Sequence, residues 1–322
     1  MNELVLYLIK SGISLILLYA VFWLFLSRDT FFRLNRGYLV TSVVFSLLFP
    51  LLPVTFTVGD VAPTYTVMLD TIVINASRVE PAVVNNLGMF QVLTIVYLTG
   101  VSIFVLRFLF QIGQLVWMVK KYGITRHEGM NIIFVDQNYA PFSFFGLIFI
   151  NRKKLDEEQV QEIIDHEKVH IRQRHSWDLI IFEILTIVQW FNPFVWFYRH
   201  SIKTVHEYLA DEGVLLKGHS PVGYQQLLLE QSTGLQLNDL TNNFNHSLIK
   251  KRIIMMTKSK STMMARLKLL TVMPVAFVLV LAFTASPTLN MFGQTEKKLP
   301  ESFFENAADS IKKKLQDMKI NI

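Results

Sequence analysis

Four long apolar runs constrain this chain more than any other feature. They cover residues 4–26, 38–58, 90–110 and 269–286. A helix rising about 1.5 Å per residue would cross roughly 30 Å of hydrocarbon in each run. The hydrophobic content of 52%, with 26 phenylalanines, exceeds what a soluble domain usually needs. The sequence therefore predicts a multi-pass α-helical membrane protein with four transmembrane helices in the lipid bilayer.

The basic residues predict how these helices are oriented. The loop between the first two runs holds three arginines against one acid, and the loop 59–88 holds three acids against one arginine. Segment 250–268 contains seven basic residues and no acid. Because positive loops stay in the cytoplasm, the first loop and the middle of the chain should face the cytosol. The basic excess of +6 is read as this topology signal, so we expect no direct nucleic-acid binding. Contact of the cluster 250–268 with anionic lipid is the less favoured interpretation of its charge.

The runs divide the chain into four predicted parts. Residues 1–119 form three transmembrane helices with short loops, and residues 120–268 form a cytoplasmic domain inserted between helices 3 and 4. Residues 269–286 form the fourth helix, and 287–322 form a short extracytoplasmic tail. The middle part is the only sizeable soluble region that this division leaves, so an enzymatic site is expected there.

The middle region reads as a mixture of strands and helices. Asn131–Val135 and Phe142–Asn151 are rich in Ile and Phe and flank a turn at Asn138–Pro141, which predicts two strands. Asp156 is a predicted N-cap of a helix running to about Arg174. The sequence therefore predicts an α+β domain.

A metal-binding pattern lies inside that predicted helix. His166 and His170 are four residues apart, so both imidazoles leave the same face of the helix one turn apart. This spacing lets two ring nitrogens bind one Zn²⁺, with Glu167 placed to take a proton from its bound water. Two ordinary histidines on a polar helix face are the alternative.

A third ligand must come from a carboxylate or another histidine, because the chain has no cysteine. Position 176 is Ser, where the metzincin pattern requires a third His. Residues 204–216 are predicted to be helical, and Glu207 and Asp211 lie one turn apart there. We assign Glu207 to the metal and expect Asp211 to accept the free ring N–H of a ligand histidine. A solvated acidic face is the alternative.

The apolar segment 179–198 raises a question of topology. It contains Glu183, Gln189 and Asn192-Pro193, which are costly in lipid. A full crossing would also place Glu207 on the opposite side of the membrane from His166. A buried or half-embedded hairpin that breaks at Asn192-Pro193 is therefore predicted.

Together these motifs resemble a known family. His166–His170, Gln189–Trp196 and His206–Asp211 are similar to the corresponding motifs of the M56 peptidases, which include beta-lactam sensor-transducers of the BlaR1 and MecR1 type. The resemblance covers roughly residues 1–286. It implies a gluzincin-type zinc metallopeptidase fold with one Zn²⁺ on His166, His170 and Glu207 and with Glu167 as the catalytic base. It also implies a bacterial cytoplasmic membrane location.

The resemblance implies a substrate class as well. The leading hypothesis is a regulated peptidase that cleaves a cytosolic protein, such as a transcriptional repressor, or itself. An M48-like quality-control protease and a non-catalytic signalling protein with a vestigial site are the alternatives. The best-known relatives carry a large penicillin-binding domain after the last span, where this chain has only 287–322. Direct beta-lactam sensing is therefore not expected, and a homodimer is left open.

Overall fold

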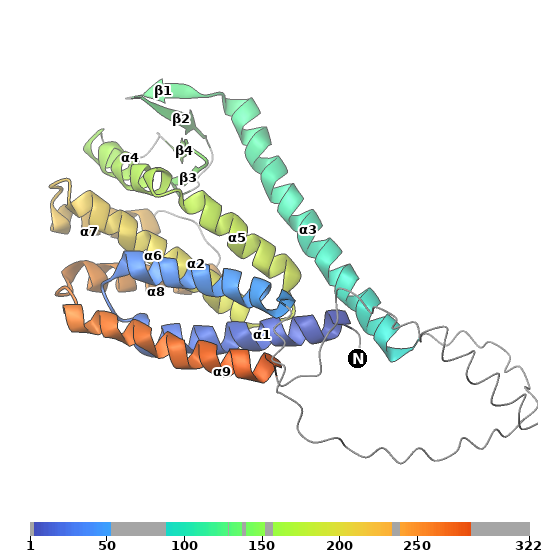
Figure 1. Cartoon of the computed structure of the whole chain (residues 1–322). Coiled ribbons are helices and arrows are strands. Elements are labelled where there is room, and N and C mark those ends of the chain that lie inside the picture. Colours follow the sequence, from blue (N-terminus) through green and yellow to red (C-terminus); the bar gives the residue numbers. More distant parts are fainter. Residues whose placement is uncertain are drawn as a thin grey trace, which may run out of the picture. The chain divides into compact units, whose positions relative to one another are not determined.

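The structure is a computed structural model of the chain. It describes residues 3–52, 88–127, 129–136, 140–151, 157–233 and 239–284. The described part is mostly helical with one small mixed sheet (Figure 1). The chain divides into the units Met1–Ser286 and Pro287–Ile322. The second unit, which contains the predicted tail, lies outside the described residues.

Four helical stretches of the described chain are long and apolar enough to cross a membrane, as predicted. They are α1 (Glu3–Val21) with the π-helical turn Phe22–Leu26, α2 (Phe32–Leu48) with the 3₁₀ turn Phe49–Leu51, α3 (Met89–Tyr122), and α9 (Val272–Thr284) preceded by the 3₁₀ segment Met263–Thr271. Helix α3 runs well past the predicted end at residue 110, because no proline interrupts it. It ends before Gly123, whose φ of 69° terminates the helix. Residues 53–58 of the second predicted span lie outside the described residues.

Large apolar side chains cover the outer surfaces of these helices. Only 6% of the most apolar window of α3 is buried inside the protein, and the same holds for the stretch containing α9. Exposed examples on α3 are Leu106, Leu109 and Phe110. A soluble protein rarely exposes so much contiguous apolar surface, whereas lipid tails would cover it without cost. These helices support the assignment of the chain as a membrane protein.

The sheet has the strand order β1-β2-β4-β3. Its strands are β1 (Thr125–His127), β2 (Met130–Phe134), β3 (Phe142–Phe144) and β4 (Leu147–Ile150). Strands β2 and β4 pair in parallel, and the other pairs are antiparallel. The prediction of one strand over Phe142–Asn151 is wrong: Phe145 and Gly146 adopt positive φ and turn the segment into a β-hairpin. As a result β3 forms an edge of the sheet.

The helices of the middle region are α4 (Glu157–Arg172), α5 (His175–Val188), α6 (Phe194–Leu215), α7 (Pro221–Thr233) and α8 (Asp239–Thr257). Helix α4 ends two residues before the predicted Arg174, because Arg174 takes a left-handed conformation with φ of 57°. The predicted cap Asp156 lies outside the described residues.

Helices α5 and α6 form the predicted hairpin, which turns through residues 189–193. The Gln189 amide donates hydrogen bonds to the Leu8 carbonyl and to Ser11 of α1. The Trp190 indole donates to the Tyr97 carbonyl of α3. These contacts satisfy the N–H groups of the Gln189 amide and the Trp190 indole, which would be costly to leave unpaired in lipid. The tip of the hairpin therefore lies beside the apolar stretches of two candidate spans.

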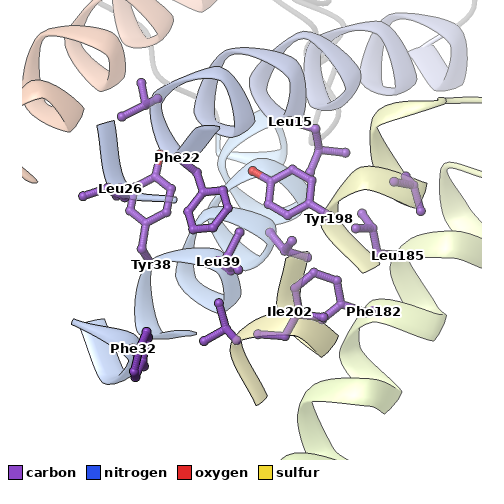
Figure 2. Close-up of a cluster of buried hydrophobic side chains, with 14 of the residues drawn as sticks. Leu15, Phe22, Leu26, Phe32, Tyr38, Leu39, Phe182, Leu185, Tyr198 and Ile202 are labelled. Atoms are coloured by element: carbon purple, nitrogen blue, oxygen red, sulfur yellow. The ribbon is translucent and has the colours of Figure 1, made fainter. Parts of the chain in front are cut away.

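One hydrophobic core joins the hairpin to the first two spans. Figure 2 shows Leu15 of α1, Leu39 of α2, Phe182 of α5 and Tyr198 of α6 packed in this core. Fully burying such side chains stabilises a fold by about 1.5–3 kcal/mol each. Helix α6 is thus held by two candidate membrane spans, α1 and α2, as well as by its neighbours in sequence. The division of the chain at residues 119 and 268 stays a prediction.

A second core positions α4. Ile132 and Ile148 of the sheet pack with Ile163 and Ile164 of α4 and with Leu227 of α7. These residues are buried, so one face of α4 is held against the sheet and α7. His166 and His170 lie on the adjoining face of α4, which packs against α6.

Candidate metal centre

The structure brings His166, His170 and Glu207 together. One ligand atom from each lies within 4.8 Å of the others. The two Nε2 atoms are 3.2 Å apart. Glu207 oxygens lie 3.4 Å from Nε2 of His166 and 3.8 Å from Nε2 of His170. Ligand atoms bound tetrahedrally to zinc at about 2.0–2.1 Å are separated by about 3.3 Å, so this donor set fits the ion in type and spacing.

A close helix crossing makes this meeting possible. Gly213 of α6 lies against Val169 of α4, and a Cβ atom at position 213 would come within 2.5 Å of the Val169 side chain. Only glycine allows this approach. Gly213 lies fewer than two turns beyond Glu207 on α6, and Val169 directly precedes His170. The crossing therefore controls how far the carboxylate lies from the two imidazoles.

The outward-facing ring nitrogens of both histidines have partners. Nδ1 of His166 lies 2.7 Å from the Tyr224 hydroxyl, which donates to Asp211 Oδ1 at 2.9 Å. Nδ1 of His170 lies 2.7 Å from Nδ1 of His175. Such contacts fix the tautomer and orientation of metal-binding histidines. Burial lowers the pKa of His170 to about 3, which keeps the ring neutral as metal binding requires.

Asp211 differs from its prediction in one respect. Its Oδ1 atom is 3.7 Å from His166 Nδ1, too far for the direct hydrogen bond that we expected. Tyr224 of α7 lies between them and relays the contact. Sequence reasoning missed Tyr224, because it is a single tyrosine outside every motif. Only the docking of α7 against α4 and α6 places it there.

Arg252 of α8 is a second residue whose contacts at the site could not be predicted from the sequence. It was assigned to the basic topology cluster, yet it is only 8% exposed. Its guanidinium forms a bidentate pair with Asp211 and lies 2.9 Å from Glu207 Oε2. Burial alone would raise the pKa of Glu207, but Arg252 and the two histidines hold it well below its usual value. Glu207 is therefore an anion, the form that binds a metal.

A buried polar cluster joins the site to the second span. The His206 ring stacks on His175 with centroids 3.9 Å apart. Nε2 of His206 lies 2.7 Å from Asp178, and Arg36 of α2 donates two hydrogen bonds to the same carboxylate. His175 and His206 are therefore partnered side chains that lie behind the candidate metal ligands.

Glu167 lies beside the three ligand residues in a cavity of about 370 Å³. Its side chain is 5% exposed, and this burial raises the pKa of the carboxyl group. His166 and Ser143 of β3 oppose the shift. A carboxylate with a raised pKa beside a metal site accepts and releases protons near neutral pH more readily than an ordinary Glu. The arrangement is suited to proton transfer next to a metal-bound water.

Known proteins match this part of the chain. The family description "BlaR1 peptidase M56" matches residues 147–256. This match includes every residue placed at the site except Arg36 and Ser143. Residues 147–256 are therefore similar to the M56 peptidases. This similarity suggests a metallopeptidase, and peptidases of this family are typically zinc-dependent.

The M56 assignment is supported by a curated relative. "Regulatory protein BlaR1" of Staphylococcus aureus is 27% identical over 164 residues, which are 49% of this chain and 26% of that protein. The chain therefore matches about a quarter of the relative's length. The sequence motifs, the four apolar helices and these comparisons all indicate an M56-type, BlaR1-like membrane protein.

Proposed function

We propose that this chain is a membrane-bound zinc metalloendopeptidase of gluzincin type that hydrolyses peptide bonds. The observation that carries the proposal is the convergence of His166, His170 and Glu207 within 4.8 Å, with buried Glu167 beside them. Each residue keeps the role expected from the sequence: three ligands and one base. Tyr224, together with Asp211, orients His166.

The chain's own groups would move the proton. A bound zinc ion would supply Lewis-acid chemistry, activating water and polarising the substrate carbonyl. Glu167 accepts a proton from the attacking water and later delivers it to the leaving amine. The raised pKa of Glu167 makes its carboxylate a stronger base for the first of these transfers. Glu207 stays charged because Arg252 compensates its buried carboxylate.

The edge strand β3 would bind the substrate backbone. It ends the sheet, and Phe142 and Ser143 line the cavity that contains Glu167. An extended peptide can add to such an edge through main-chain hydrogen bonds. Within the segment Phe142–Asn151, the proposed substrate-binding edge is therefore Phe142–Phe144.

The proposed biological role is regulated signalling. The zinc site would face the cytoplasm of a bacterium, where the enzyme would cleave a regulator such as a transcriptional repressor, or itself. General degradation of damaged membrane proteins is the competing role, and a vestigial site is the non-enzymatic one. The contacts of Arg36 with the polar cluster favour signalling, because they join a membrane helix to residues behind a metal ligand.

The decisive experiment compares cells carrying the wild-type protein with cells carrying Glu167→Gln. Loss of the base should lower cleavage by about 10²–10⁴-fold, while purified protein still holds one zinc ion per chain. Quantitative proteomics of the two strains would report the substrate, and would separate one cleaved regulator from many damaged proteins.

A matched control is Glu212→Gln, which neutralises a neighbouring acid on α6 outside the catalytic cavity. It should leave cleavage unchanged. Two results would contradict the proposal. One is purified wild-type protein without stoichiometric zinc, and the other is identical proteomes of the wild-type and Glu167→Gln strains.

A further inference from the structure

The cavity at the candidate metal centre does not end at the metal ligands. A second cavity of about 150 Å³ lies between α3, α5 and α6. Leu179 of α5 and Lys203 of α6 line both cavities. The two cavities therefore adjoin at these side chains, and together they are called the groove.

The walls of the second cavity are mainly apolar. Helix α3 contributes Phe108, Ile112 and Leu115, and β3 contributes Phe144. An apolar cavity of about 150 Å³ holds a molecule the size of benzene. The space is thus large enough for one aromatic or branched aliphatic side chain. Because α3 is a candidate span, one wall of this groove belongs to a membrane helix.

The junction of the two cavities carries an excess of positive charge. Arg107 and Arg199 each lie 2.9 Å from the same carboxylate, that of Glu183. Lys203 has no ion-pair partner among the described residues, and its side chain remains exposed to solvent. Burial lowers the pKa of Lys203, Arg199 and Arg107 lower it further, and Glu183 and Glu207 oppose the shift without cancelling it. An added negative charge would relieve this repulsion.

Strand β3 runs beside both cavities. Phe142 and Ser143 line the first cavity, and Phe144 lines the second. The outer edge of β3 is not paired with another described strand. A peptide added along that edge would place alternate side chains about 6.6 Å apart. Successive side chains on one face could then reach the metal site, Lys203 and the apolar cavity.

We propose that the groove selects an extended polypeptide with an acidic side chain at Lys203 and a large apolar side chain in the cavity beside α3. The inference rests on the proposed peptidase function and names its substrate class. Charge complementarity selects the acidic residue, and cavity size selects the apolar one.

The charge preference is tested by profiling cleavage of a proteome-derived peptide library with zinc-loaded full-length protein in lipid nanodiscs. Wild type should favour peptides with Asp or Glu near the cleaved bond by about tenfold. Lys203→Glu should reverse this preference toward Lys and Arg. Lys250→Glu makes the same charge change on the exposed surface of α8, outside both cavities, and should keep the wild-type profile.

The apolar preference is tested by filling the second cavity. Ile112→Trp should shift the preferred residue from large to small apolar side chains. Leu109→Trp places the same ring on the exposed surface of α3, where the residue is 57% exposed and lines neither cavity. It should leave the profile unchanged.

A binding measurement separates this inference from the proposed function. The inactive variant Glu167→Gln should bind fluorescent peptides containing Glu-Phe about tenfold more tightly than peptides containing Lys-Phe, and Lys203→Glu in the same background should reverse that order. Cleavage without any acidic preference, or equal profiles for Lys203→Glu and Lys250→Glu, would overturn the groove assignment and leave the peptidase standing. Selective binding without cleavage by wild type would overturn the peptidase and support the groove.

Discussion

Individual side chains behind the ligands decide how well the metal site is formed. His166 and His170 each direct Nε2 toward Glu207 because Tyr224 and His175 contact their Nδ1 atoms. Without such partners an imidazole can rotate and change tautomer. In the proposed metal site, His166 and His170 would therefore be only part of what sets the metal affinity.

Removing the Tyr224 hydroxyl tests this dependence. Tyr224→Phe keeps the ring in its core but leaves His166 Nδ1 without its partner, so zinc affinity should fall by about 10–100-fold. Zinc competition with a chelating dye on purified protein measures the change. Tyr208→Phe is the control, since Tyr208 lies on α6 in the hydrophobic core shared with the first two candidate spans and does not contact the ligand histidines. Equal affinities of wild type and Tyr224→Phe would refute the relay.

Asp178 makes stability depend on pH. Burial raises its pKa, but hydrogen bonds from His206 and Arg36 outweigh burial and hold the pKa below the ordinary value. A depressed carboxyl pKa contributes stability above the unfolded-state pKa of about 3.9, and this contribution is lost as pH falls through the folded-state pKa.

Asp178→Asn should therefore lower the melting temperature in detergent at pH 7, and the gap from wild type should narrow as pH falls from about 5 toward 3. Thermal unfolding followed by intrinsic fluorescence measures both. A gap that is constant with pH would show that the Asp178 charge does not stabilise the fold.

At the scale of elements, the crossing of α4 and α6 sets the ligand geometry. Gly213→Ala should push the helices apart because its Cβ would overlap Val169. Overpacking of this kind costs about 1–3 kcal/mol of stability, and zinc binding should weaken with it. Melting temperature and zinc stoichiometry are the measurements.

A second substitution makes that test specific. Val169→Ala removes the clashing methyl groups, so the double variant Gly213→Ala with Val169→Ala should recover zinc binding. Gly223→Ala is the matched control, because the nearest neighbour of its added Cβ would be 3.7 Å away. A Gly213→Ala protein that binds zinc like wild type would show that the crossing tolerates the extra atom.

At the scale of the whole molecule, the membrane helices and the site helices share one core. Leu15 and Leu39 of the spans are buried against Phe182 and Tyr198 of the hairpin (Figure 2). A movement of α1 or α2 would therefore be transmitted to α6, which carries Glu207. This continuity gives a signal from the membrane a physical route to the site.

Orientation in the membrane is also testable at this scale. The chain has no cysteine, so single cysteines can be introduced without background labelling. Cysteines replacing Arg28 and Lys258 should react with an impermeant maleimide only in inverted vesicles. A cysteine replacing Asp70 should react in intact cells. The reverse pattern would place the metal site outside the cytoplasm.

Local sequence signals predicted several elements correctly. Four apolar helices, a helix carrying His166 and His170, and a hairpin breaking near Asn192-Pro193 follow from apolar run length, helical spacing and proline chemistry. The split of Phe142–Asn151 escaped prediction, since Phe145 carries a positive φ that non-glycine residues seldom adopt. Helix ends were missed where a residue adopts a positive φ, as Gly123 does after α3 and Arg174 does after α4.

The sequence by itself determined which residue types could bind a metal on α4, because the four-residue spacing of His166 and His170 places two imidazoles on one helical face whatever surrounds the helix. Only the tertiary structure decided that Glu207 meets them, that Tyr224 stands between Asp211 and His166, and that Arg252 is buried. Those contacts join α4, α6, α7 and α8. They depend on helix packing over long sequence separations, which no local spacing encodes.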